Sequence, residues 1–335
     1  MRARKTLSAV SVILVGIIAG CAFDIADEGA PAPANRDVPT IAPSNAEGGR
    51  LVTPPATYVH PTGPTCDPEA PFGVPSLVKL PVRESDHIVA LHLFPDGLSA
   101  SLVRVFNSSE RTEIEGYLVR RSSLASPFTE LAPLGLPTWL NVTALDERYG
   151  LSITGDGLRA YYSITEPGGV PQMVTSSRST TADAFGAPVV EHDLNVPGVN
   201  AGDPFVREDG RVVYFIRDDR TFRGVLQGEH RYQVEEVPEA SPASSGFHNL
   251  GGLVITPDDL TIYFWSTTKA EHSAHVTMAR RASVNAPFEA PRDVTLTVVG
   301  GTMVGWPTYA TADNCRLYFN GGTNFQNYVA ERPAR

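Results

Sequence analysis

Five turns centred on an aspartate recur along the chain, and each leads into an apolar strand that carries aromatic residues. The five aspartates are Asp96, Asp156, Asp209, Asp258 and Asp313. The segments that follow them read LSASLV, LRAYYS, RVVYFI, LTIYFW and CRLYFN. Successive aspartates lie 49 to 60 residues apart, which leaves room for several short strands in each unit. A repeat of this length predicts the blades of a β-propeller.

The second repeat shows the order of strands within one unit. Its apolar segments cover residues 149–154, 158–165, 172–177 and 189–194. The first two are separated by Gly155-Asp156-Gly157, and Asp-Gly supplies the positive φ that a tight hairpin requires. No long amphipathic helical pattern interrupts the repeats, which disfavours an α/β fold. Each unit is therefore expected to be a four-stranded antiparallel sheet.

The fifth repeat lacks a fourth strand, because the chain stops at Arg335 soon after the third. The missing piece is found at the other end of the domain, where 72–80 begins with the Phe-x-x-Pro pattern of a fourth strand. An N-terminal strand that completes the last blade would close the ring without leaving an open sheet edge. We therefore predict an all-β, five-bladed propeller closed by this strand.

The first twenty residues have the pattern of an export signal. Arg2, Arg4 and Lys5 precede an apolar run over 7–19 that is too short to span a bilayer. The run ends in Ile18-Ala19-Gly20-Cys21, which resembles the lipobox of bacterial lipoproteins. That resemblance implies cleavage before Cys21 and its acylation; the alternative is an ordinary secretory signal with an incidental cysteine. Ala22 follows Cys21, at the position where an Asp would resemble the signal for retention in the inner membrane. The resemblance therefore favours the outer membrane.

The predicted organisation is a signal peptide over 1–20, a flexible tether over 21–63 and a propeller over 64–335. The tether is rich in Pro, Ala, Asp and Asn and shows no strand or helix period, so it cannot bury enough apolar surface to fold. The formal net charge of −10 disfavours nucleic acid as a partner. We expect a monomer that contacts the membrane through its N-terminal lipid alone.

The recurring Asp-Gly turn, Tyr-Phe strand, Arg-Ser pair and Pro-Phe-x-x-Pro segment resemble the WD-like (TolB-type) β-propeller repeat of bacterial envelope lipoproteins. The resemblance covers about 270 residues. It implies a binding or scaffold module whose partner is an envelope protein or a glycan, and it carries over no catalytic residues. The chain departs from TolB itself in having five repeats rather than six.

Two cysteines remain beside Cys21. Cys315 opens the second strand of the fifth blade, and Cys66 lies just before the segment that completes the same blade. Export would place both in an oxidising compartment. We predict a disulfide between Cys66 and Cys315, the alternative being two buried, unpaired thiols.

Six residues on the first strands are candidates for facing the axial channel. They are His92, Ser152, Asp203, Phe205, Trp306 and Tyr309. Plain packing between the inner strands is the competing interpretation.

No catalytic motif is recognisable in the sequence. A propeller hydrolase of the glycoside hydrolase or lactonase type is the alternative function, yet a glycoside hydrolase needs paired carboxylates, and only Asp203 stands where it could reach the channel. His272 falls in the connection over 267–273 and His275 in the strand after it, and both fit exposed positions better than a metal site. We expect no metal, no cofactor and a non-catalytic module.

Overall fold

The computed structural model describes residues 66–335, apart from 84–85, 108–111, 138–149, 166–168, 242–246, 269–273, 297–303 and 322–325. These residues belong to one compact unit, Thr53–Arg335. The predicted signal peptide, Cys21, the tether and His272 lie outside the described residues, and the domain boundary at residue 64 stays a prediction. Within the described part of the chain, no helix has the length and apolar character needed to cross a bilayer.

The described strands form five antiparallel sheets of four strands each. Blade 1 comprises β2 (His87–Leu93), β3 (Ser99–Asn107), β4 (Thr112–Arg120) and β5 (Glu130–Pro133). Blade 2 comprises β6 (Leu151–Ile153), β7 (Arg159–Ile164), β8 (Gln172–Ser177) and β9 (Val189–Val190). Blade 3 comprises β10 (Ala201–Val206), β11 (Val212–Arg217), β12 (Arg220–Gly228) and β13 (Arg231–Glu236). Blade 4 comprises β14 (Phe247–Ile255), β15 (Thr261–Thr268), β16 (Ala274–Arg280) and β17 (Arg292–Val294). Blade 5 comprises β18 (Val304–Ala310), β19 (Arg316–Gly321), β20 (Gln326–Glu331) and β1 (Ser76–Leu77).

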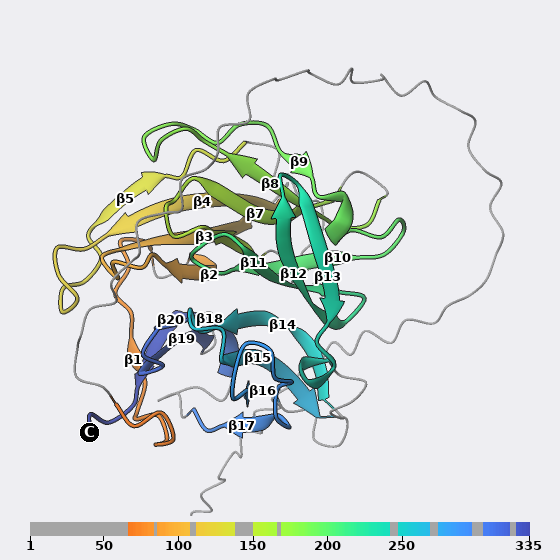
Figure 1. The fold of residues 1–335 in the computed structure, drawn as a ribbon. Helices are drawn as coiled ribbons and strands as arrows, with labels where there is room; N and C mark the ends of the chain where they lie inside the picture. The colour runs from red at the N-terminus through yellow and green to blue at the C-terminus, as the bar shows by residue number, and fades with distance from the viewer. Residues whose placement is uncertain are drawn as a thin grey trace, which may run out of the picture. The chain divides into compact units, whose positions relative to one another are not determined.

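The five sheets form a closed ring (Figure 1). The first strand of each blade contacts the first strand of the next, in the order β2, β6, β10, β14, β18 and back to β2. Aromatic residues on the second strands fill the space between blades, and Tyr161, Tyr214 and Tyr263 are fully buried. The predicted five-bladed, all-β propeller is confirmed.

The ring closes in blade 5, where the N-terminal strand β1 lies beside the C-terminal strand β20 (Figure 1). Ser76 is paired with Val329 and Leu77 with Tyr328. Backbone N–H groups on either side extend the contact, since Gly73 donates to Glu331 O and Val78 to Asn327 O, both at 2.8 Å. The predicted closure by the segment 72–80 is confirmed.

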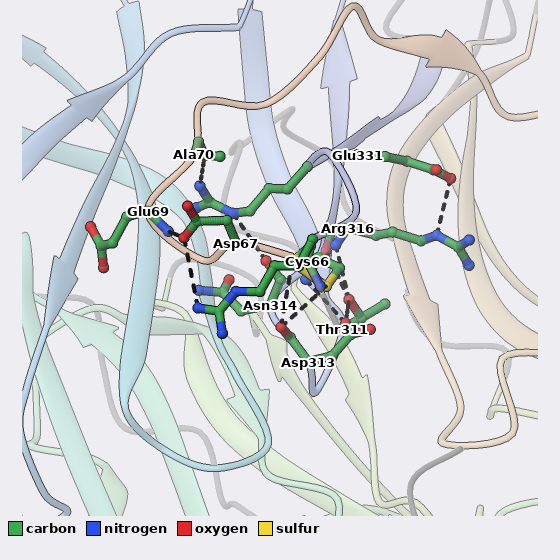
Figure 2. Close-up of a disulfide and its surroundings, with 12 residues drawn as sticks. Cys66, Asp67, Glu69, Ala70, Thr311, Asp313, Asn314, Arg316 and Glu331 are labelled. Carbon is green, nitrogen blue, oxygen red and sulfur yellow. Dashed lines mark hydrogen bonds and ion pairs between the residues drawn. A yellow bond between two sulfur atoms is a disulfide. The ribbon is translucent and has the colours of Figure 1, made fainter. Parts of the chain in front are cut away.

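A disulfide joins Cys66 to Cys315 beside this closure (Figure 2). The two Cα atoms are 5.6 Å apart, within the usual range for a disulfide. Both cysteines are buried, and Cys66 also forms an isolated β-bridge with Ala334. The predicted pairing is therefore present, at the point where the two ends of the domain meet.

The five turn aspartates shape their own hairpins. In each turn the aspartate Oδ1 accepts the backbone N–H two residues later, at 2.8 to 3.0 Å. The residue after the aspartate has a positive φ in all five, and it is glycine in three. In blades 4 and 5 it is Asp259 and Asn314, residue types that tolerate this conformation. The turn aspartates therefore stabilise their own hairpins.

Two further elements of the repeat hold the hairpin to the fourth strand in blades 1, 2, 4 and 5. An arginine after the third strand donates through Nε to the carbonyl oxygen of the positive-φ residue, and its guanidinium stacks on the phenylalanine that opens the fourth strand. This pairing recurs as Arg121 with Phe128, Arg178 with Phe185, Arg281 with Phe288 and Arg332 with Phe72. In blade 5 the phenylalanine comes from the N-terminal segment. The closing segment thus reproduces the side-chain contacts of an ordinary blade as well as its strand.

One predicted strand is wrong in its extent. The sequence indicated a fourth strand over 189–194 in blade 2, but β9 ends at Val190 and the 3-10 turn η1 (His192–Leu194) follows. The side chain of Leu194 is fully buried, and it lies against Gly224 of blade 3, where a Cβ atom would approach Leu194 Cδ2 to 2.9 Å. The strand ends because this leucine packs between blades 2 and 3.

Candidate functional site

Four of the five first strands are irregular at one level of the ring. Register shifts occur between Ile88 and Ala90 in β2 and between Gly202 and Phe205 in β10. Similar shifts lie between Asn249 and Val254 in β14 and between Val304 and Tyr309 in β18. Bulges bend a strand and redirect its side chains, and they are common near binding and active sites. This level, near the start of the first strands, is called the mouth below.

Asp203 occupies the bulge of β10. Its φ is +50°, an uncommon conformation for a residue other than glycine within a strand. The residue is 7% exposed. Neighbouring blades make room for it with glycines: a Cβ on Gly251 would lie 2.8 Å from Asp203 Oδ2, and one on Gly150 would lie 2.8 Å from Asp203 Cα. A residue kept in such a conformation points to a functional role.

Two indole rings complete the mouth on the side of blades 4 and 5. Trp265 is paired with Gly251 across β14 and β15. Trp306 of β18 packs on Gly252, where any Cβ would collide with its own at 2.4 Å. The two rings meet edge to face, with centroids 5.6 Å apart, and both residues are partly exposed. A Cβ atom on Gly251 would also lie 3.7 Å from Trp306 Nε1. The Asp203 carboxylate and this indole therefore both pack against Gly251.

The next level of the ring is filled by a buried aromatic layer of His92, Phe205 and Tyr309. The His92 ring lies 5.0 Å from Phe205 and 5.3 Å from Tyr309, between centroids. All three side chains are buried, so this layer forms a floor beneath the mouth. Burial lowers the pKa of His92 to about 4, and the imidazole is therefore neutral at pH 7.

This burial makes the stability of the fold depend on pH through His92. The folded-state pKa of about 4 lies below the ordinary 6.5, so the unfolded chain takes up this proton first. The stabilisation is complete above pH 6.5 and is lost as the pH falls towards 4, by about 3 kcal/mol in all. The unfolding free energy of the wild type should therefore fall between pH 7 and pH 4. In His92→Phe, which keeps an aromatic ring but has no titrating group, we predict that this fall is smaller by about 3 kcal/mol. Urea unfolding of both proteins at the two pH values measures it, and equal losses would show that the imidazole is not buried.

The six residues predicted to face the channel have different fates. Asp203 and Trp306 lie together at the mouth, whereas His92, Phe205 and Tyr309 pack against one another below it. Ser152 is buried, and its Oγ accepts the backbone N–H of Val206 at 2.9 Å, which ties blade 2 to blade 3. Sequence reasoning missed Trp265 and the paired glycines Gly251-Gly252; the Gly-Gly step inside an apolar strand was the available signal.

The carboxylate that follows Asp203 on the same blade is too distant to form the pair that hydrolysis of a glycoside requires. Glu208, the next carboxylate on the same blade, lies five residues after Asp203, on the order of 16 Å along an extended chain. Catalytic carboxylates in glycoside hydrolases lie about 5 to 9.5 Å apart. No cluster of three or more His, Cys, Asp or Glu side chains suited to a metal ion exists among the residues that the structure describes.

Comparisons with known proteins show the fold alone. No protein-family model matches the sequence, and no curated protein matches it. The α-L-arabinofuranosidase PaAbf62A of Podospora anserina, solved with cellotriose, is 11% identical with a TM-score of 0.53, over 81% of this chain and 98% of its own. The catalytic domain of a Coprinopsis cinerea GH62 α-L-arabinofuranosidase is 10% identical with a TM-score of 0.50, over 80% and 98%. TolB from Acinetobacter baumannii is 16% identical with a TM-score of 0.41, and the match covers 75% of this chain and 55% of TolB.

Proposed function

We propose that this chain is a lipid-anchored protein of the bacterial cell envelope whose propeller is a non-catalytic binding module for a glycan. The anchor is Cys21, at the end of the lipobox-like Ile18-Ala19-Gly20-Cys21, with the outer membrane as the favoured location. The segment 22–63 then acts as the spacer between lipid and propeller.

The observation that carries the binding proposal is the set of groups at the mouth, Asp203, Trp265 and Trp306. A pyranose ring presents C–H groups that suit the electron-rich face of an indole. Its hydroxyl groups donate hydrogen bonds, which a carboxylate accepts. The carboxylate and the two indoles come from rigid strands of three blades. The buried aromatic layer beneath them keeps a ligand at the surface of the propeller. A glycan fits this set better than a protein partner, whose docking needs a wider apolar surface.

Hydrolysis is the second candidate, because Asp203 has the strained conformation expected of a functional carboxylate. A catalytic pair would need a second carboxylate within about 10 Å of Asp203. Glu208, on the same blade, is too distant for that role, whereas Asp203 and the two indole rings together suit the binding of a glycan.

The test is a glycan array probed with the purified full chain and with two variants. Asp203→Asn keeps a residue type that accepts positive φ but removes the charge, and it is expected to weaken glycan binding by about tenfold to a hundredfold. Trp306→Ala should weaken it similarly, while Asp218→Asn, at an exposed positive-φ site in the β11–β12 turn, should leave it unchanged.

Two results would contradict the proposal. If Asp203→Asn binds the glycan as tightly as the wild type, the mouth is not the binding site. Turnover of a glycoside by the wild type that Asp203→Asn abolishes would make the protein an enzyme.

A further inference from the structure

A cavity of about 330 Å³ opens on the other side of the ring, where the Asp-centred turns lie. It is bounded by the hairpin turn of blade 1, by blade 5 and by the disulfide, and Glu208 reaches it from blade 3. Its volume lies at the lower end of the range for small-molecule sites. Asp203 and Glu208 lie on either side of the buried floor, so this cavity is distinct from the mouth.

Aromatic rings line the inner part of this cavity. They belong to Phe94, Tyr309 and Tyr318, and the two tyrosine rings lie 6.2 Å apart at an angle of 59°. Leu124, which is 46% exposed, stands at the outer rim. Aromatic faces that converge on a small volume attract cations through their quadrupoles, most strongly in desolvated sites.

A carboxylate completes the aromatic set. Glu208 Oε1 accepts a hydrogen bond from the Tyr309 hydroxyl at 3.3 Å, which holds the acid beside the tyrosine ring. A carboxylate next to aromatic faces provides a favourable charge for an ammonium group at short range. The formal charge of −10 on the chain would also draw cations towards the surface.

The other charged groups of the cavity are engaged within the fold. Arg121 and Arg332 donate through Nε to turn carbonyls and stack on phenylalanines. Arg316 is paired with Glu331 at 3.0 Å, as Figure 2 shows. Asp96 and Asp313 accept the backbone N–H groups of their own turns. With four carboxylates and three guanidinium groups, the lining carries one net negative charge.

We propose that this cavity is a binding site for an organic ammonium ion, with the cationic head between Tyr309, Tyr318 and Glu208 and the apolar body extending towards Leu124. The site is independent of the proposed glycan-binding function. It adds a second, cationic ligand on the opposite side of the propeller from the proposed glycan site.

Choline and its neutral carbon analogue 3,3-dimethyl-1-butanol are the matched probes, titrated into the full chain by isothermal calorimetry. The two have nearly the same shape, so the difference in their affinities isolates the charge. Choline is expected to bind at least about tenfold more tightly than the alcohol. Glu208→Gln should weaken choline binding and leave the affinity for the alcohol unchanged, which narrows the difference between the two. Leu124→Lys, at an exposed position where folding is unaffected, should weaken choline alone by repulsion at the rim.

Asp203→Asn should leave choline binding intact, because Asp203 lies on the other side of the buried aromatic layer. The choline experiment can therefore fail while the glycan proposal stands, and the reverse. Equal affinity for choline and the alcohol would overturn the proposal, as would undiminished choline binding by Glu208→Gln. Absence of choline binding at the highest concentration the protein tolerates would overturn it as well.

Discussion

Replacement of both Cys66 and Cys315 by serine is expected to lower the free energy of unfolding by about 5 kcal/mol. The disulfide spans 249 residues, and cross-linking so long a loop removes much of the entropy of the unfolded chain. The strand that it secures is short, since β1 contributes only Ser76 and Leu77 to the sheet. With native domains stable by only about 5 to 15 kcal/mol, loss of the bond should leave the ring close to its unfolding threshold.

Urea unfolding of the wild type and of the double serine variant measures this difference. The wild type treated with reductant serves as the control, and it should match the double variant. A difference below about 1 kcal/mol would mean that the bond contributes little to stability, since chain entropy alone predicts several times more.

Asp259→Asn is expected to destabilise the fold by about 3 to 5 kcal/mol. The Asp259 carboxylate is fully buried between blades 3 and 4 and pairs with Arg281 at 2.8 Å. Arg207 and Arg223 approach its other oxygen at 3.5 and 3.6 Å. Removing this charge takes away the buried carboxylate that Arg281 shares with Arg207 and Arg223, although the latter two keep Asp209 and Glu235 as partners. The Tyr214 hydroxyl donates to Oδ1 at 2.7 Å, and burial together with the Asp259 charge raises the pKa of Tyr214 well above its ordinary value.

Blade 5 provides an internal precedent for the geometry of this variant. Asn314 occupies the equivalent turn position, has a similar φ, and accepts the Tyr263 hydroxyl at 2.6 Å. Asparagine therefore fits the turn and the tyrosine contact, and the predicted loss isolates the charge. Asp218→Asn, an exposed positive-φ aspartate, is the matched control and should change the unfolding free energy by less than about 0.5 kcal/mol. If Asp259→Asn changes it as little, the arginines are satisfied without Asp259.

Strand order, blade number and ring closure were predictable because each rests on a local pattern that repeats. The Asp-centred turn recurs because its carboxylate bonds the backbone, and the Arg and Phe of the repeat recur because they stack on one another in four blades. The partnership of Arg332 with Phe72 shows why the N-terminal Phe-x-x-Pro segment was recognisable as part of the last blade.

The candidate site was only partly predictable. The spacing from the turns found Asp203 and Trp306, yet it could not separate them from His92 or Tyr309, because bulges in the first strands change which side chains reach the surface. Trp265 lies on a second strand and reaches the mouth only because Gly251 has no side chain. The cavity beside Glu208 depends on contacts between blades 1, 3 and 5, which no single repeat encodes.

Closure of the ring by the N-terminal strand is tested most directly by hydrogen exchange at the amides of Gly73 and Val78. Both donate to carbonyl oxygens of the C-terminal segment, on Glu331 and Asn327. They should exchange as slowly as the amides within β20 that bond to β19. Exchange at the rate of an unstructured peptide, with the other blades protected, would contradict the closure.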